Sequence, residues 1–112
     1  MKNSFQKISI ALGIGLFIAA CAGSKVTTST EPTQADVDRN KVVFSNLTLD
    51  ELVQGKAYYE KSCGSCHKLY SPTSESAVAW KKIVPPMAKK AKVDAKTEDL
   101  ILKYVISMSS KK

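Results

Sequence analysis

The sequence is poor in the side chains from which metal and catalytic sites are usually built: its 112 residues include one histidine, three cysteines and one tryptophan. A structural zinc site takes four cysteine or histidine ligands, whereas only Cys63, Cys66 and His67 lie together here, too close in sequence to surround a metal alone. A single histidine also excludes a metal held by two imidazoles of this chain. No segment alternates apolar and polar residues with a period of two, so strands are not expected and the predicted fold class is all-α.

The residues Cys63, Cys66 and His67 form the pattern Cys-x-x-Cys-His, the attachment signature of a c-type haem. Two thiols three positions apart can each form a thioether with one vinyl group of the same porphyrin, and the adjacent imidazole then reaches one axial face of the iron. A disulfide, a zinc site and a thioredoxin-like centre are the alternatives, and the last requires alternating strands and helices. We expect one covalent haem c, with His67 as the proximal ligand.

The first twenty residues predict export. Lys2 and Lys7 precede an apolar run from Ile8 to Ala20, which has the form of a secretory signal and is too short to span a bilayer as a mature helix. The small residues directly before Cys21 resemble the lipobox of bacterial lipoproteins, in which the cysteine receives lipid after cleavage. An ordinary signal peptide with an incidental cysteine is the alternative. Lipid on Cys21 would account for the odd thiol among three cysteines.

Three regions are therefore expected: a cleaved lipoprotein signal peptide (1–20), a lipid-anchored flexible linker (21–41) and a folded domain (42–112). The linker is small, polar and rich in Ser and Thr, so it cannot bury enough apolar surface to order itself. About seventy residues make a thin core, so the haem-free domain should be poorly folded. The expected location is the extracytoplasmic or periplasmic side of a bacterial membrane, which excludes nucleic acid as a partner.

The first and last helices of the domain are well marked. Thr48 and Glu51 form a capping box, and Leu47 and Leu52 stand where a hydrophobic staple would hold the helix start. This helix runs on toward the haem motif. The last helix is predicted over residues 94–108, with an apolar stripe at helical spacing that consists of Leu100, Ile101, Tyr104, Val105 and Met108.

A middle helix is predicted over residues 76–84. Pro85 and Pro86 are expected to interrupt it, because proline lacks the amide hydrogen and clashes with the preceding turn. A short helix can restart at Pro86, since proline is tolerated in a first turn, and run through Met87 to Ala91.

Gly55 and Tyr59, just before the haem motif, resemble the N-terminal helix of class I cytochromes c. In that family a glycine lets the N- and C-terminal helices cross closely, and a neighbouring aromatic packs on the partner helix, where Ile101 and Tyr104 are the matching positions. The resemblance implies a small helical domain wrapped around one covalent haem. It further implies a protein that transfers single electrons between redox partners and is not an enzyme.

The second axial ligand is expected to be Met87, which follows the proline pair, while Met108 falls on the apolar stripe and is expected in the core. Lys89 or Lys90 and an open site are the alternatives. Histidine and methionine together raise the potential of a cytochrome c and leave no vacant position. An open site would instead suit a small-ligand sensor or a peroxidase-like domain, but the chain has no second histidine and Arg39 lies in the linker.

Two further residues are implied by the resemblance. The carbonyl of Pro72 is expected to accept the imidazole N–H of His67, which fixes the tautomer and tunes the metal. Trp80 is expected either to donate its indole N–H to a haem propionate or to serve as a core aromatic.

The formal charge is +7, and loss of Lys2 and Lys7 with the signal leaves +5. In class I cytochromes c, lysines around the haem edge steer docking to acidic redox partners, an effect that salt weakens. A solvated basic face and contact with anionic lipid head groups are the alternatives. The lysines that bracket Met87 are Lys81, Lys82, Lys89, Lys90, Lys92 and Lys96.

Overall fold

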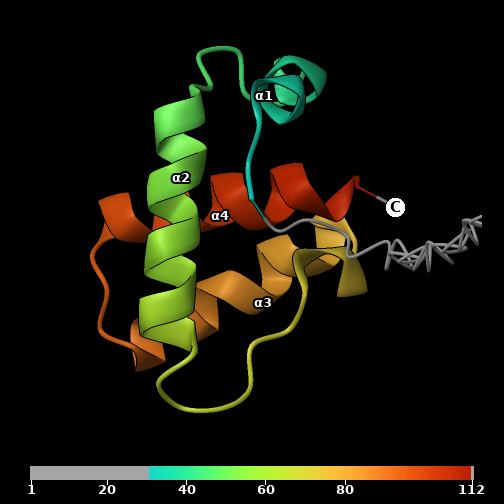
Figure 1. The fold of residues 1–112 in the computed structure, drawn as a ribbon. Helices are drawn as coiled ribbons and strands as arrows, with labels where there is room; N and C mark the ends of the chain where they lie inside the picture. Colours follow the sequence, from blue (N-terminus) through green and yellow to red (C-terminus); the bar gives the residue numbers. More distant parts are fainter. Residues whose placement is uncertain (1–30, 112) are drawn as a thin grey trace, which may run out of the picture.

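The computed structural model describes residues 31–111, and this part of the chain is all-helical without strands, which confirms the predicted fold class. Its elements are α1 (Gln34–Asn40), α2 (Leu49–Tyr58), the π-helical turn η1 (Tyr59–Cys63), the 3-10 turn η2 (Pro72–Ser74), α3 (Ala77–Lys90) and α4 (Ala95–Ser109) (Figure 1). The predicted signal peptide and Cys21 lie outside the described residues. Among the helices of residues 31–111, none combines the length and apolar character needed to cross a membrane.

The start of α2 follows the sequence prediction. The side chain of Thr48 accepts a hydrogen bond from the amide of Glu51, and the Glu51 carboxylate accepts one from the amide of Thr48 at 3.1 Å. Leu47 and Leu52 are both buried in one small apolar cluster, as a hydrophobic staple requires. The capping box and the staple together fix where α2 begins.

α2 lies across α4 at the centre of the molecule (Figure 1). The crossing point is Gly55, where an added Cβ would come within 2.8 Å of the Cβ of Tyr104 and 2.9 Å of the carbonyl carbon of Leu100. The predicted close crossing at this glycine is therefore confirmed. Asp94 caps α4, and its side chain accepts a hydrogen bond from the amide of Thr97. α4 carries most of the main core, the buried cluster of Tyr59, Trp80, Val84, Ile101, Tyr104, Val105, Ile106 and Met108.

The predicted break in the middle helix is wrong, because α3 continues through Pro85 and Pro86 to Lys90. Both prolines are exposed, so the two hydrogen bonds that they forfeit lie on the solvent side of the helix, where water can satisfy the carbonyls. On the opposite face Trp80 and Val84 are buried in the main core, so packing against α4 keeps the helix continuous.

The last part of the predicted linker is also ordered. Residues 34–40 form α1, which packs against α4 and α2 and buries Val37 at 1% exposure. The side-chain amide of Asn40 donates to the backbone carbonyl of Ser107 at 3.2 Å, which joins α1 to the end of α4. Residues 34–41 therefore belong to the folded domain, because one apolar residue and several specific polar contacts hold a segment whose composition is that of a linker.

Asp36 supplies most of those polar contacts. Its side chain is fully buried; it accepts from the hydroxyl and amide of Thr33, each at 2.8 Å, and forms ion pairs with Arg39 at 2.9 Å and Lys111 at 3.0 Å. Burial alone would raise the pKa of Asp36, but hydrogen bonds from Lys111 and Thr33 outweigh it and hold that pKa below its usual value. The carboxylate is therefore charged at neutral pH and joins α1 to the C-terminal end of the chain.

Candidate functional site

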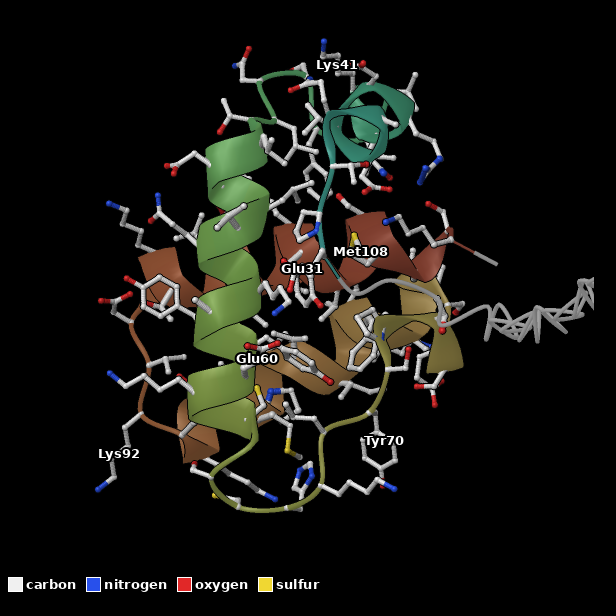
Figure 2. All side chains as sticks on the ribbon, in the orientation of Figure 1. Glu31, Lys41, Glu60, Tyr70, Lys92 and Met108 are labelled. Carbon is white, nitrogen blue, oxygen red and sulfur yellow. The ribbon has the colours of Figure 1, made fainter. Side chains whose placement is uncertain are left out.

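A cavity of about 400 Å³ lies between η1, the loop that follows it, and α3. In Figure 2 this end of the molecule is marked by Tyr70 on the loop and Lys92 beyond α3. The volume lies in the range of natural cofactor and ligand cavities. Its walls bring together most of the site residues predicted from the sequence, namely Cys63, Cys66, His67, Trp80 and Met87.

Cys63 is the last residue of η1, where the end of α2 widens into a π-helical turn, a local variation often found at functional sites, and Cys66 lies in the turn that follows. Cys63 is half-buried and packs against the main core, Cys66 is exposed, and no disulfide joins them. Burial raises the pKa of the Cys63 thiol, and the neighbouring Cys66 raises it further. A thioredoxin-like centre requires strands alternating with helices, and residues 31–111 contain no strand, so this alternative is disfavoured.

The zinc alternative finds no support in the geometry. Across residues 31–111, no group of three or more histidine, cysteine, aspartate or glutamate side chains is arranged to hold a metal ion. The motif therefore offers two thiols and one imidazole to the same cavity without completing a tetrahedral site.

His67 is exposed, and its Nδ1 lies 2.9 Å from the carbonyl oxygen of Lys68. A carbonyl only accepts, so Nδ1 carries the proton and Nε2 keeps the lone pair that a metal ligand needs. The expected acceptor, the Pro72 carbonyl, is not the partner in this structure. In this structure the Pro72 carbonyl accepts from another donor, and its expected role toward His67 stays a prediction.

That donor is the indole N–H of Trp80, which lies 2.8 Å from the Pro72 carbonyl oxygen. Trp80 is 3% exposed, and an indole has a single hydrogen to donate, so the propionate role is not supported. Trp80 is instead a core aromatic that also holds the start of η2. The hydroxyl of Tyr59 makes a similar bond of 2.6 Å to the carbonyl of Tyr70.

These two loop contacts were not predicted from the sequence. Tyr59 was expected only as the aromatic at the helix crossing, and its ring does lie against Tyr104 with centroids 5.7 Å apart. Burial raises the pKa of Tyr59 to about 12, so its hydroxyl stays protonated and donates. A buried tyrosine hydroxyl needs an acceptor, and that requirement was the available signal for a further partner.

Met87 is half-buried on α3 and lines the same cavity as His67. Met108 is 1% exposed and belongs to the main core, in line with the role expected from the apolar stripe. Of the two lysines considered as ligands, Lys90 lines the cavity. Ligation of a metal by Met87 stays a prediction.

The donor set of the cavity fits a haem. Two thiols and an imidazole come from one short segment, a thioether comes from α3, and the remaining walls are largely apolar, as a porphyrin requires. These apolar walls include Tyr59, Ile83, Val84 and Ala91. The two cysteines could hold the ring, and His67 and Met87 could serve as axial ligands.

A family model described as "Dihaem cytochrome c" matches residues 59–112, which is 54 of the 112 residues and includes the whole Cys-x-x-Cys-His motif. No curated protein and no solved structure matches the chain. The family match supports a c-type cytochrome. It points to haem-based electron transfer, and to an electron carrier rather than an enzyme.

Proposed function

We propose that this chain acts as a c-type cytochrome with one covalent haem on Cys63 and Cys66 and an axial pair formed by His67 and Met87. It would transfer single electrons between redox partners in the cell envelope. The observation that carries the proposal is the cavity, because it presents two thiols, an imidazole and a thioether to one largely apolar space. No other part of residues 31–111 combines these groups.

A haem count of one is proposed from the composition. The matched family is described as dihaem, but the chain has one Cys-x-x-Cys-His motif and no histidine other than His67. A second c-type haem would need a second pair of thiols and a second imidazole, and only Cys21 remains. One haem also agrees with the resemblance to class I cytochromes c in the glycine-mediated helix crossing.

When bound, the haem supplies a one-electron change at its iron. The protein's part is to bind, orient and shield. Cys63 and Cys66 would hold the ring, and the Nδ1–H bond to the Lys68 carbonyl keeps the lone pair of His67 on Nε2, where it could bind iron. The apolar walls exclude water, which favours the less charged, reduced state and raises the potential.

The envelope location and the membrane anchor are part of the proposal and rest on the N-terminal sequence alone. An exported chain suits a covalent haem, and lipid on Cys21 would keep the domain at a membrane surface. The lysines around α3 are all exposed, which suits docking to acidic redox partners by long-range attraction.

The axial methionine is tested by replacing sulfur with carbon at constant volume. Met87→Leu should abolish the far-red ferric band of sulfur-to-iron charge transfer and should lower the reduction potential. Met108→Leu is the matched control, because Met108 lies in the core and its loss of sulfur should leave the band intact. Spectra of the purified haem-loaded proteins decide the matter.

Three outcomes would contradict the proposal. Wild-type protein without covalent haem would refute the whole assignment. A wild-type spectrum that lacks the far-red band, with ready binding of CO, would replace the electron carrier by a small-ligand site. Loss of the band in Met108→Leu, with the band kept in Met87→Leu, would make Met108 and not Met87 the axial ligand.

A further inference from the structure

The segment that follows the haem motif, residues 68–72 (the post-motif segment), has little backbone structure of its own. Residues 68–71 belong to no helix or strand and connect η1 to η2. Yet the carbonyl of Lys68 lies 2.9 Å from Nδ1 of His67. Contacts from outside the segment must therefore keep its backbone in place if this bond is to persist.

Two buried aromatic side chains provide such contacts. The Tyr59 hydroxyl donates to the carbonyl of Tyr70 at 2.6 Å, and the Trp80 indole donates to the carbonyl of Pro72 at 2.8 Å. The two donors therefore reach the post-motif segment at two points, one from η1 and one from α3. The Trp80 bond is buried and the Tyr59 bond is partly buried, and a hydrogen bond shielded from bulk water is stronger than one at the surface.

The donors cannot easily turn away. Tyr59 is 6% and Trp80 3% exposed, and their rings pack edge to face, with centroids 6.1 Å apart and planes at 85°. Each ring supports the other, and both belong to the main core. Leu69, which lies in the sequence between His67 and the acceptor residues Tyr70 and Pro72, packs against the same core. The position of the segment is therefore set by the core.

We propose that Tyr59 and Trp80 are positioning residues that hold the post-motif segment so that the Lys68 carbonyl stays against the imidazole N–H of His67. The inference rests on the proposed function, since positioning matters only where His67 is a metal ligand. A carbonyl that accepts the imidazole N–H makes the ring a stronger donor to metal. A stronger donor favours the oxidised state, so the two aromatics lower the reduction potential.

The test removes each bond while keeping an aromatic ring, in haem-loaded Tyr59→Phe and Trp80→Phe. Tyr58→Phe is the matched control, because it makes the same chemical change one residue earlier on a side chain that is 36% exposed. Val105→Ala, in a core residue of α4, controls for a general loss of stability. The measurements are haem content, midpoint potential and the NMR signals of the His67 ring.

Both positioning variants should keep covalent haem, because the motif is untouched. Their midpoint potentials should rise above wild type, and their His67 ring signals should shift. The imidazole N–H should exchange with water about tenfold faster, the ratio that corresponds to loss of a hydrogen bond worth about 1.4 kcal/mol. Tyr58→Phe and Val105→Ala should keep the wild-type potential and ring signals, although Val105→Ala melts earlier.

Unchanged potentials and His67 signals in both positioning variants would overturn the inference while leaving the haem assignment intact. Wild-type protein without covalent haem would overturn the proposed function and the inference with it. If Trp80→Phe fails to fold, Tyr59→Phe carries the test alone, because it removes one oxygen atom and leaves the ring packing in place.

Discussion

Gly55→Ala should destabilise the domain at the crossing of α2 and α4. The added methyl group would lie 2.8 Å from the Cβ of Tyr104 and 2.9 Å from the carbonyl carbon of Leu100, whereas carbon atoms pack best at about 3.5–4.0 Å. Backbone atoms and a Cβ cannot rotate away, so the helices must separate by roughly 0.7–1 Å. Overpacking of this kind costs about 1–3 kcal/mol.

An opposing contribution comes from helix propensity, because alanine is about 1 kcal/mol better than glycine inside a helix. The steric cost falls at the upper end of its range, since three atoms including the Leu100 carbonyl oxygen are met at once. The expected net loss is therefore about 2 kcal/mol. In a domain of this size that lowers Tm by about 8–16 °C.

The assay is thermal unfolding of the haem-loaded protein, followed by far-ultraviolet circular dichroism. Ala57→Gly is the control, because Ala57 is exposed on the same helix and the change is the reverse of Gly55→Ala. It measures the difference in helix propensity alone and should cost about 1 kcal/mol. A Tm for Gly55→Ala equal to wild type or above it would show that the helices do not depend on close approach here.

Two further predictions concern charge. Asp36→Asn should cost about 2 kcal/mol at pH 7, because it leaves the paired cations without their buried partner, whereas Asp38→Asn on the exposed side of α1 should change little. Because the folded-state pKa of Asp36 is lowered, the stability that its carboxylate contributes is complete above about pH 4 and is lost as the pH falls below it. In urea titrations, an equal difference in the free energy of unfolding between Asp36→Asn and wild type at pH 7 and pH 3 would contradict this. The double variant Lys89→Glu, Lys90→Glu should slow oxidation by anionic hexacyanoferrate(III) at low ionic strength, with the difference gone near 1 M salt; a stopped-flow rate unaffected by the variant would remove these lysines from the docking surface.

The features that could be predicted from the sequence depend on near neighbours. The capping box of Thr48 and Glu51 joins residues three apart, and the apolar stripe of α4 follows the helical period. Cys63, Cys66 and His67 are placed together by adjacency alone. Gly55 is an exception that the resemblance supplied, since its partner helix lies some fifty residues further along the chain.

The errors all arise where distant packing outweighs a local rule. Pro85 and Pro86 should end a helix, but their missing bonds face solvent while the other face is held by the core. Residues 34–41 have the composition of a linker, and Asp36 orders them through Lys111 at the far end of the chain. The acceptor of the Trp80 indole could not be chosen from sequence, because it depends on how the loop folds back.

If Cys21 carries lipid, as proposed, the docking of α1 limits how far the domain can lie from the membrane. With lipid on Cys21, a linker ending at Val42 would span about 70 Å when fully extended. Because Glu31 already contacts the domain through an ion pair with Lys56 at 3.0 Å, only ten steps separate Cys21 from it, and the extended reach is about 35 Å. That is little more than the width of the domain itself. An electron partner would have to present its own redox centre within that shallow layer, which favours partners embedded in or seated on the same membrane over freely diffusing ones.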